Sequence, residues 1–117
     1  MTPDTLEAHC LSLPGAHLVI QWMDSRVYKV DAKMFAVMGS EGSGVTLKCE
    51  SEDTARMLIE AGVARVASHL KRGGWVFIAL GDMPEEELKT RPTRSYALVR
   101  QTLTKAKQAA LPPFEGG

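Results

Sequence analysis

The chain has 117 residues, the length of one domain with a modest core. Apolar residues make up 44% and charged residues 24%, a balance that argues against an intrinsically disordered chain. No apolar run reaches the roughly 18 residues that a membrane helix needs, and the first twenty residues do not resemble a signal peptide. We therefore expect a cytoplasmic protein without membrane contact, in which Cys10 and Cys49 stay reduced.

The first half of the chain predicts a helix followed by short strands. Residues 3–13 form the helix, because three apolar residues recur at helical spacing: Leu6, Cys10 and Leu13. Pro14-Gly15 ends it. Strands are then predicted at 18–23, 27–30, 34–38 and 45–49, with turns at 24–25 and 31–33 and a Gly-rich loop at 39–44. The third strand has almost no polar residue, which predicts a central strand covered on both faces.

The second half predicts a larger share of helix. Ser51 caps one helix, and residues 63–74 form a loop or a short helical turn. Residues 75–80 form the most apolar strand. Pro84 opens another helix, which Pro92 interrupts or restarts. From Thr93 to about Ala109 a buried stripe is expected at Tyr96, Val99, Leu103 and Ala106.

This order of elements predicts a two-layer α+β fold. Hairpin-length links require antiparallel pairing, and helices that do not alternate with strands exclude a doubly wound sheet. We expect an antiparallel sheet of about five strands with helices packed on it. Residues 1–111 form this one domain, and residues 112–117, with two prolines and two glycines, form a flexible C-terminal tail.

No residue pattern predicts catalysis, a metal site or a cofactor. Gly39 and Gly44 have the spacing of a phosphate loop, but a strand follows them, so a hairpin loop is predicted. The histidines and cysteines lack the spacing of metal ligands. Cys49 lies on the inner side of its strand, where a thiol is usually a small apolar side chain rather than a nucleophile.

Positive charge is concentrated in the second half. Residues 1–60 hold five Lys/Arg and nine Asp/Glu, whereas residues 61–117 hold nine and five, so the net charge is zero. Basic side chains beside an aromatic ring favour binding to nucleic acid. The candidate nucleic-acid-binding residues are Arg65, His69, Lys71, Arg72, Trp75, Arg94 and Arg100. The alternatives are a core position for Trp75 and a solvated back of the last helix for the arginines on it.

Five short motifs together resemble the MmcQ/YjbR family of small bacterial proteins. They are Leu13-Pro14-Gly15-Ala16, Lys33-Met34-Phe35-Ala36, Val45-Thr46-Leu47-Lys48-Cys49, Gly73-Gly74-Trp75-Val76 and Ser95-Tyr96-x-Leu98-Val99. The resemblance covers roughly residues 5–104. It implies a two-layer fold similar to that of secretion chaperones and a DNA-binding role, with no agreed catalytic residues to transfer. Where the family keeps an unbroken helix, Arg91 and Pro92 predict a break in this chain.

The leading hypothesis is a non-enzymatic binding protein that contacts DNA through residues 65–75 and the basic side of the last helix. A sequence pI of 6.8 is low for this role, because DNA-binding domains commonly exceed about 9. The alternative is a protein–protein interaction module, for example a homodimer that uses a sheet edge or an apolar patch. A third hypothesis is an enzyme or ligand-binding protein with a pocket between sheet and helices.

Overall fold

The computed structural model describes residues 1–67, 70 and 73–114. The elements, in chain order, are α1 (Pro3–Ser12), β1 (Ala16–Gln21), β2 (Ser25–Val30), β3 (Lys33–Met38), β4 (Gly44–Lys48), α2 (Glu52–Glu60), β5 (Arg65–Val66), β6 (Trp75–Ala79), α3 (Glu85–Gln101) and α4 (Lys105–Ala110). The predicted α+β class with an antiparallel sheet is confirmed, and the sheet has six strands rather than about five. None of the described helices is long and apolar enough to cross a membrane.

The sheet has the strand order β1-β2-β3-β4-β6-β5, and every pair of neighbours is antiparallel. Three successive hairpins build β1 to β4, as the short links in the sequence predict. The chain then leaves the sheet through α2 and returns, so that β6 pairs with β4 and β5 forms the outer edge. The other edge is β1.

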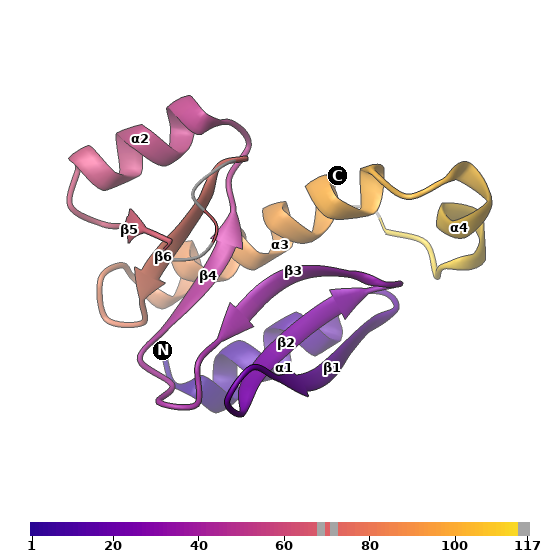
Figure 1. Cartoon of the computed structure of the whole chain (residues 1–117), viewed down its shortest axis with the longest axis horizontal. Helices are drawn as coiled ribbons and strands as arrows, with labels where there is room; N and C mark the ends of the chain where they lie inside the picture. Colours follow the sequence, from indigo (N-terminus) through magenta and orange to yellow (C-terminus); the bar gives the residue numbers. More distant parts are fainter. Residues whose placement is uncertain (68–69, 71–72, 115–117) are drawn as a thin grey trace.

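The helices leave one face of the sheet open over its central strands. α3 packs on β3 and β4, α1 packs beside β1, and both helices pass behind the sheet in the view of Figure 1. α2 packs against β5 and β6. Side chains from the helices and the covered sheet face form one core, whose largest fully buried members include Leu6, Tyr28, Phe35, Leu47, Ile78, Leu88 and Tyr96.

Several local predictions are confirmed by this core. Leu6, Cys10 and Leu13 are buried, and Thr2 caps α1 by accepting a hydrogen bond of 3.1 Å from the amide of Thr5. The alternating strand predicted at 45–49 buries its inward residues Val45, Leu47 and Cys49. Ser51 caps α2 as predicted: its hydroxyl accepts a hydrogen bond of 3.0 Å from the amide of Thr54.

The prediction that β3 is covered on both faces is wrong. β3 is central in the strand order, but the helices cover only one of its faces. Met34 and Val37 are only partly buried, and both line a hollow on the other face. A run of apolar residues therefore indicated an open apolar surface here rather than a second helical layer.

Residues 63–74 contain a strand, where a loop or short helical turn was predicted. In β5, Arg65 pairs with Phe77 and Val66 pairs with Val76. This pairing gives backbone partners to the outer edge of the apolar strand β6. Two residues carry too little periodicity to reveal a strand in the sequence.

The C-terminal helix differs from the prediction at both Pro92 and its end. α3 runs without a break from Glu85 to Gln101, with Pro92 buried inside it. An internal proline costs a helix about 3 kcal/mol, but burial of a large apolar side chain contributes about 1.5–3 kcal/mol each, and α3 buries Leu88, Tyr96 and Val99. The helix then stops, so Ala106, predicted as buried, is exposed on the separate helix α4.

Part of the predicted flexible tail contacts the domain. The ring of Phe114 packs edge-on against that of Tyr96, with the ring centroids 4.7 Å apart. Leu111 and Phe114 both pack against the core. The sequence signal for this contact was the aromatic residue Phe114, which directly follows Pro113.

Candidate functional site

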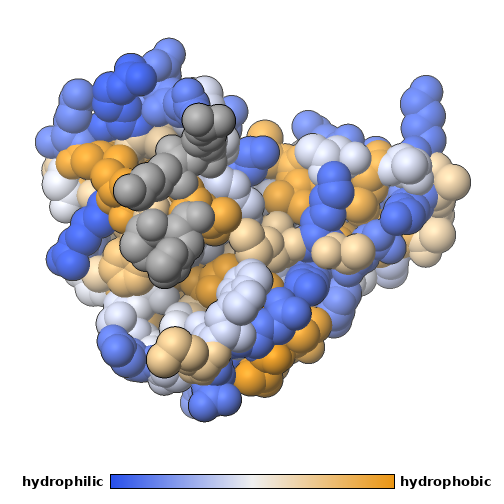
Figure 2. Space-filling model, viewed as in Figure 1, coloured by the Kyte–Doolittle hydropathy of each residue, from blue (hydrophilic) through white to orange (hydrophobic). Residues whose placement is uncertain are grey.

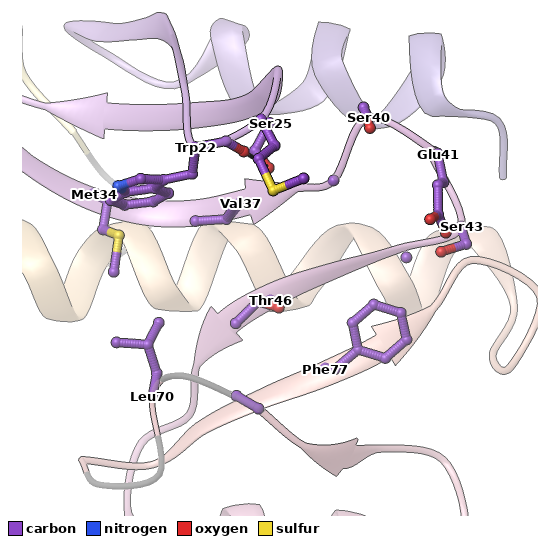
Figure 3. A pocket seen from close by; sticks show the side chains of 14 residues that line it. Trp22, Ser25, Met34, Val37, Ser40, Glu41, Ser43, Thr46, Leu70 and Phe77 are labelled. Carbon is purple, nitrogen blue, oxygen red and sulfur yellow. Dashed lines mark hydrogen bonds between the residues drawn. The ribbon is translucent and has the colours of Figure 1, made fainter.

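The main candidate site is a groove of about 880 Å³ on the open face of the sheet. Its floor comes from β3, β4 and β6, and its rim comes from the turn after β1, the loop between β3 and β4, and Ala67 and Leu70, which follow β5. In Figure 3, α3 runs behind the sheet and the groove side chains lie in front of it. The lining side chains that the figure labels are Trp22, Ser25, Met34, Val37, Ser40, Glu41, Ser43, Thr46, Leu70 and Phe77.

The floor of the groove is one row of side chains across neighbouring strands. Val37 pairs with Thr46, Thr46 with Phe77, and Phe77 with Arg65. Because cross-strand partners lie on the same face of a sheet, these residues form a continuous row. The row contains the apolar side chains of Val37 and Phe77 with Thr46 between them, and its β5 end is the exposed cation Arg65. Figure 2 shows apolar surface in the middle of this face and hydrophilic residues around much of its rim.

A strained turn places aromatic and apolar side chains on the rim. Trp22, Met23 and Asp24 have φ angles of 42°, 59° and 68°, so all three occupy the left-handed region. The predicted strand 18–23 therefore ends earlier, at Gln21, and the turn comes two residues before the predicted one. Ser25 holds this turn by donating a hydrogen bond of 2.9 Å from its hydroxyl to the carbonyl of Trp22.

This turn is costly to the folded state in two ways. Each non-glycine residue in the left-handed region costs about 1–2 kcal/mol. In addition, Trp22 is 59% exposed and Met23 is 93% exposed, although burying such side chains would stabilise the protein. Strain and exposed aromatic surface at one place are features of binding sites.

The loop 39–44 is a hairpin loop between β3 and β4, as predicted. It forms the polar end of the groove through Ser40, Glu41 and Ser43. Gly44 allows the ring of Phe77 to lie over the start of β4, because a Cβ at Gly44 would clash with that ring. The glycine therefore helps to set the shape of the groove at this end.

The predicted nucleic-acid residues do not form one surface among the residues that the structure describes. His69, Lys71 and Arg72 lie outside the described residues. Arg65 is exposed on β5, at the end of the groove floor. Trp75 is half-buried at the start of β6, where it lines a second, smaller hollow with Val66 and Arg56.

Arg94 forms part of a small charged cluster with Arg91 and Glu50. The two arginines lie three residues apart on α3, and Glu50 follows the end of β4. Arg94 Nη1 is 3.8 Å from Glu50 Oε2, and Arg91 Nη1 is 3.7 Å from Glu50 Oε1. Arg91 was not among the predicted site residues; two arginines at helical i,i+3 spacing were the signal that could have identified it.

Arg100 is a structural residue rather than a free cation. Its Nη1 donates a hydrogen bond of 2.7 Å to the hydroxyl of Tyr96, and its guanidinium lies 5.9 Å from the ring centroid of Phe114. The structure therefore does not place Arg94, Arg100 and Lys107 on one side of a single helix. Six residues turn an α-helix by about 240° between Arg94 and Arg100, and Lys107 lies on α4, a different helix.

The two cysteines are free and buried, on α1 and after β4. Burial, reinforced by the charge of Glu7, raises the pKa of the Cys10 thiol to about 12. Burial also raises the pKa of Cys49. Neither thiol has the lowered pKa of a nucleophile. Within the described ranges, no group of three or more His, Cys, Asp or Glu side chains is placed to hold a metal ion.

The comparisons with known proteins agree with the resemblance carried by the five motifs. The family model YjbR matches residues 11–98. The chain belongs to the YjbR family. It is also similar to the crystal structure of the Deinococcus radiodurans protein DR2400, whose family-model domain is DUF419, with a TM-score of 0.83 and 28% sequence identity over 99% of this chain and 94% of that chain. A search of curated proteins found no match.

The motifs that carry the YjbR resemblance have structural roles in this chain. Ser95 is fully buried; its hydroxyl donates to the carbonyl of Phe35 (2.5 Å) and accepts from the amide of Lys48 (2.9 Å). It therefore bridges β3 and β4 just beyond their last cross-strand pair. Tyr96 donates from its hydroxyl to the carbonyl of Pro14, which joins α3 to the loop after α1.

Gly74 has a similar structural role in the fourth motif. Its carbonyl accepts a hydrogen bond of 2.8 Å from the amide of Cys49. Its φ angle is +79°, and a Cβ there would lie 3.1 Å from the carbonyl oxygen of Ser51. These motif residues maintain the fold, whereas the groove rim at Trp22 and Met23 lies outside all five motifs.

Proposed function

We propose that this YjbR-family protein is a non-enzymatic, cytoplasmic binding module that holds an extended apolar segment of another protein in the open-face groove. The observation that carries the proposal is the strained turn that holds Trp22 exposed at the rim of an apolar groove. An extended segment suits this place because a groove of about 880 Å³ is large enough for several side chains. A rim tryptophan supplies the large apolar contact area that protein-binding sites favour.

The charge of the rim indicates which partner segments would bind best. Glu41 lines the polar end of the groove, and Asp24 lies in the turn beside Trp22. Carboxylates at both places attract a cation and repel a phosphate. The expected partner segment therefore combines apolar side chains with at least one lysine or arginine.

Nucleic-acid binding is the second candidate, and Arg65 is the observation that favours it. Arg65 is exposed at the end of the groove floor, and in the sequence it belongs to the same basic segment as Lys71 and Arg72. Binding to phosphates grows with the number of cations that contact them. We rank this candidate second because Arg100 is engaged by Tyr96, and because the carboxylates of Glu41 and Asp24 at the groove rim repel phosphate.

The protein could also bind a partner through the edge strand β1, in which case the partner is a second copy of this chain. β1 is an edge strand of six residues, and it exposes Leu18 and Ile20. Natural edge strands are commonly blocked by lysine, proline or a bulge, and β1 contains none of these. Sedimentation equilibrium tests this form directly, because pairing of two β1 edges predicts a concentration-dependent dimer.

The test of the groove is an NMR titration with two synthetic peptides. Both contain alternating leucines; one carries a lysine and the other a glutamate at the same place. We expect the lysine peptide to bind more tightly and to shift the indole signal of Trp22 and the amide of Thr46. Trp22→Ser should abolish these shifts, whereas Met57→Ser, which removes an exposed apolar side chain outside the groove, should not.

A DNA duplex titrated under the same conditions separates the two candidates. The groove proposal is wrong if both peptides leave Thr46 unchanged. Duplex binding that falls steeply with salt, and that weakens in a Lys71→Ala/Arg72→Ala variant, would instead support the nucleic-acid candidate.

A further inference from the structure

We infer that Arg91 and Arg94 form a second binding site, for an oxyanion of the phosphate type, and that the Glu50 carboxylate occupies this site in the free protein. The site lies where α3 crosses the end of β4, on residues that take no part in the groove. The inference does not depend on the proposed function, because it concerns different residues and a different class of ligand.

The first argument is that Arg91 is buried without the hydrogen bonds that a guanidinium needs. Only 13% of its side chain is exposed. Its Nε and Nη1 atoms are fully buried, and among the residues that the structure describes neither has a hydrogen-bond acceptor. Buried guanidinium groups are nearly always hydrogen-bonded, because an unpaired buried donor is costly. Because both atoms are covered, an acceptor from outside can reach them only when a neighbouring side chain such as Glu50 moves aside.

The second argument is that Glu50 forms ion pairs with both arginines but a hydrogen bond with neither. Its carboxylate oxygens lie 3.7 Å from Arg91 Nη1 and 3.8 Å from Arg94 Nη1. Charge-assisted hydrogen bonds between these groups are about 2.7–2.9 Å long and frequently bidentate. One carboxylate is thus shared between two arginines, and both distances are longer than a charge-assisted hydrogen bond. Arg56 and Asp53 on α2 form an ordinary pair at 2.9 Å, whereas Arg26 and Lys89 contact carboxylates at 3.7–3.9 Å, as Arg91 and Arg94 do. Arg91 differs from Arg26 and Lys89 in its burial, because 13% of its side chain is exposed against 37% and 31% of theirs.

The third argument is the match between this cluster and the chemistry of phosphate. Two guanidinium groups face one carboxylate, so the cluster has a net charge of about +1, which attracts an anion. A phosphate group has more acceptor oxygens than a carboxylate and can serve two arginine forks at once. Arg94 is 53% exposed, which leaves one side of the cluster open to solvent. Glu50 is itself partly exposed, and its side chain can move away when an anion enters.

The experiment measures phosphate affinity in four proteins by NMR, with chloride keeping the ionic strength constant. They are the wild type, Glu50→Gln, Arg94→Gln and the control Arg56→Gln. Because Glu50 competes with phosphate, we expect Glu50→Gln to bind phosphate on the order of 3- to 10-fold more tightly. Arg94→Gln should bind on the order of 10-fold more weakly, since it loses a charged donor. Arg56→Gln should match the wild type.

Several outcomes would overturn the inference. Glu50→Gln that binds phosphate no more tightly than the wild type would show that Glu50 does not occupy the site. A loss in Arg56→Gln as large as that in Arg94→Gln would show that phosphate senses only the overall charge. Arg94 carries the test because the more buried Arg91 also contributes to folding, and its replacement would confuse the two effects.

A parallel titration with a DNA duplex identifies the source of the phosphate. Duplex binding that depends on Glu50 and Arg94 in the same way would assign the site to a nucleic-acid backbone. Binding of inorganic phosphate alone would assign it to a small phosphorylated ligand. Either result supports an oxyanion site, and neither should change in the Trp22→Ser variant used to test the groove.

Discussion

The bridge that Ser95 makes between β3 and β4 predicts a large loss of stability in Ser95→Ala. The side chain is fully buried and serves two backbone groups, the carbonyl of Phe35 at 2.5 Å and the amide of Lys48 at 2.9 Å. An alanine leaves both groups without their partner, and each unpaired buried group costs about 1–3 kcal/mol. The expected loss is about 2–5 kcal/mol, a large share of the roughly 5–15 kcal/mol that stabilise a typical domain.

Urea denaturation followed by circular dichroism measures this loss. A lower urea midpoint with an unchanged m value would show that the free energy of unfolding has fallen without a change in the surface exposed on unfolding. The melting temperature should fall by roughly 10 °C or more for a domain of this size. Hydrogen exchange adds a local test, because the amide of Lys48 should lose its protection in the variant.

The matched control for Ser95→Ala is Ser12→Ala. Ser12 is exposed at the end of α1, and its hydroxyl donates a hydrogen bond to the carbonyl of His9. Its replacement should change stability by no more than about 0.5 kcal/mol. A loss of similar size in both variants would refute the reasoning, and so would a Ser95→Ala variant that loses less than about 0.5 kcal/mol.

Three further variants or reagents test other parts of the structure. Gly44→Ala should lose about 1–3 kcal/mol in urea denaturation, because its Cβ would lie 2.6 Å from the backbone carbonyl oxygen of Ile78 and would also meet the ring of Phe77; a neutral change would contradict this packing. The Cys10 thiol, whose pKa burial raises to about 12, should react with a thiol reagent at pH 8 only after the protein is unfolded. Burial lowers the pKa of His9 below 6.5, so the free energy of unfolding should keep its full value above about pH 6.5 and fall as the pH drops from there towards the folded-state pKa. His9→Gln should flatten this pH dependence. A pH dependence identical to that of the wild type would contradict the prediction.

Local patterns in the sequence were sufficient for most of the elements. Helical spacing of Leu6, Cys10 and Leu13 identified α1, and strict alternation identified β4, because both patterns reflect which face of one element is buried. The antiparallel pairing followed from hairpin-length links. These features depend only on neighbours in the chain, so residue order alone carries them.

The errors lie where distant contacts outweigh a local preference. Pro92 predicted a helix break, but packing of α3 against β3 and β4 keeps the helix continuous through the proline. The two residues of β5 form a strand only because β6 offers an unpaired edge. Phe114 lies in a segment of tail-like composition and is held by Tyr96, which comes from the middle of α3.

For the candidate sites too, some features follow from the sequence and others depend on contacts between distant elements. Residue types and their order determined that this is an α+β protein of the YjbR family with positive charge concentrated in its second half. Only the tertiary structure decided that Trp22 stays exposed beside a groove, that Arg100 is bound to Tyr96, and that Glu50 lies between Arg91 and Arg94. The physical reason is that exposure and charge pairing depend on which elements meet in space, whereas helical and strand periodicity depend on one element at a time.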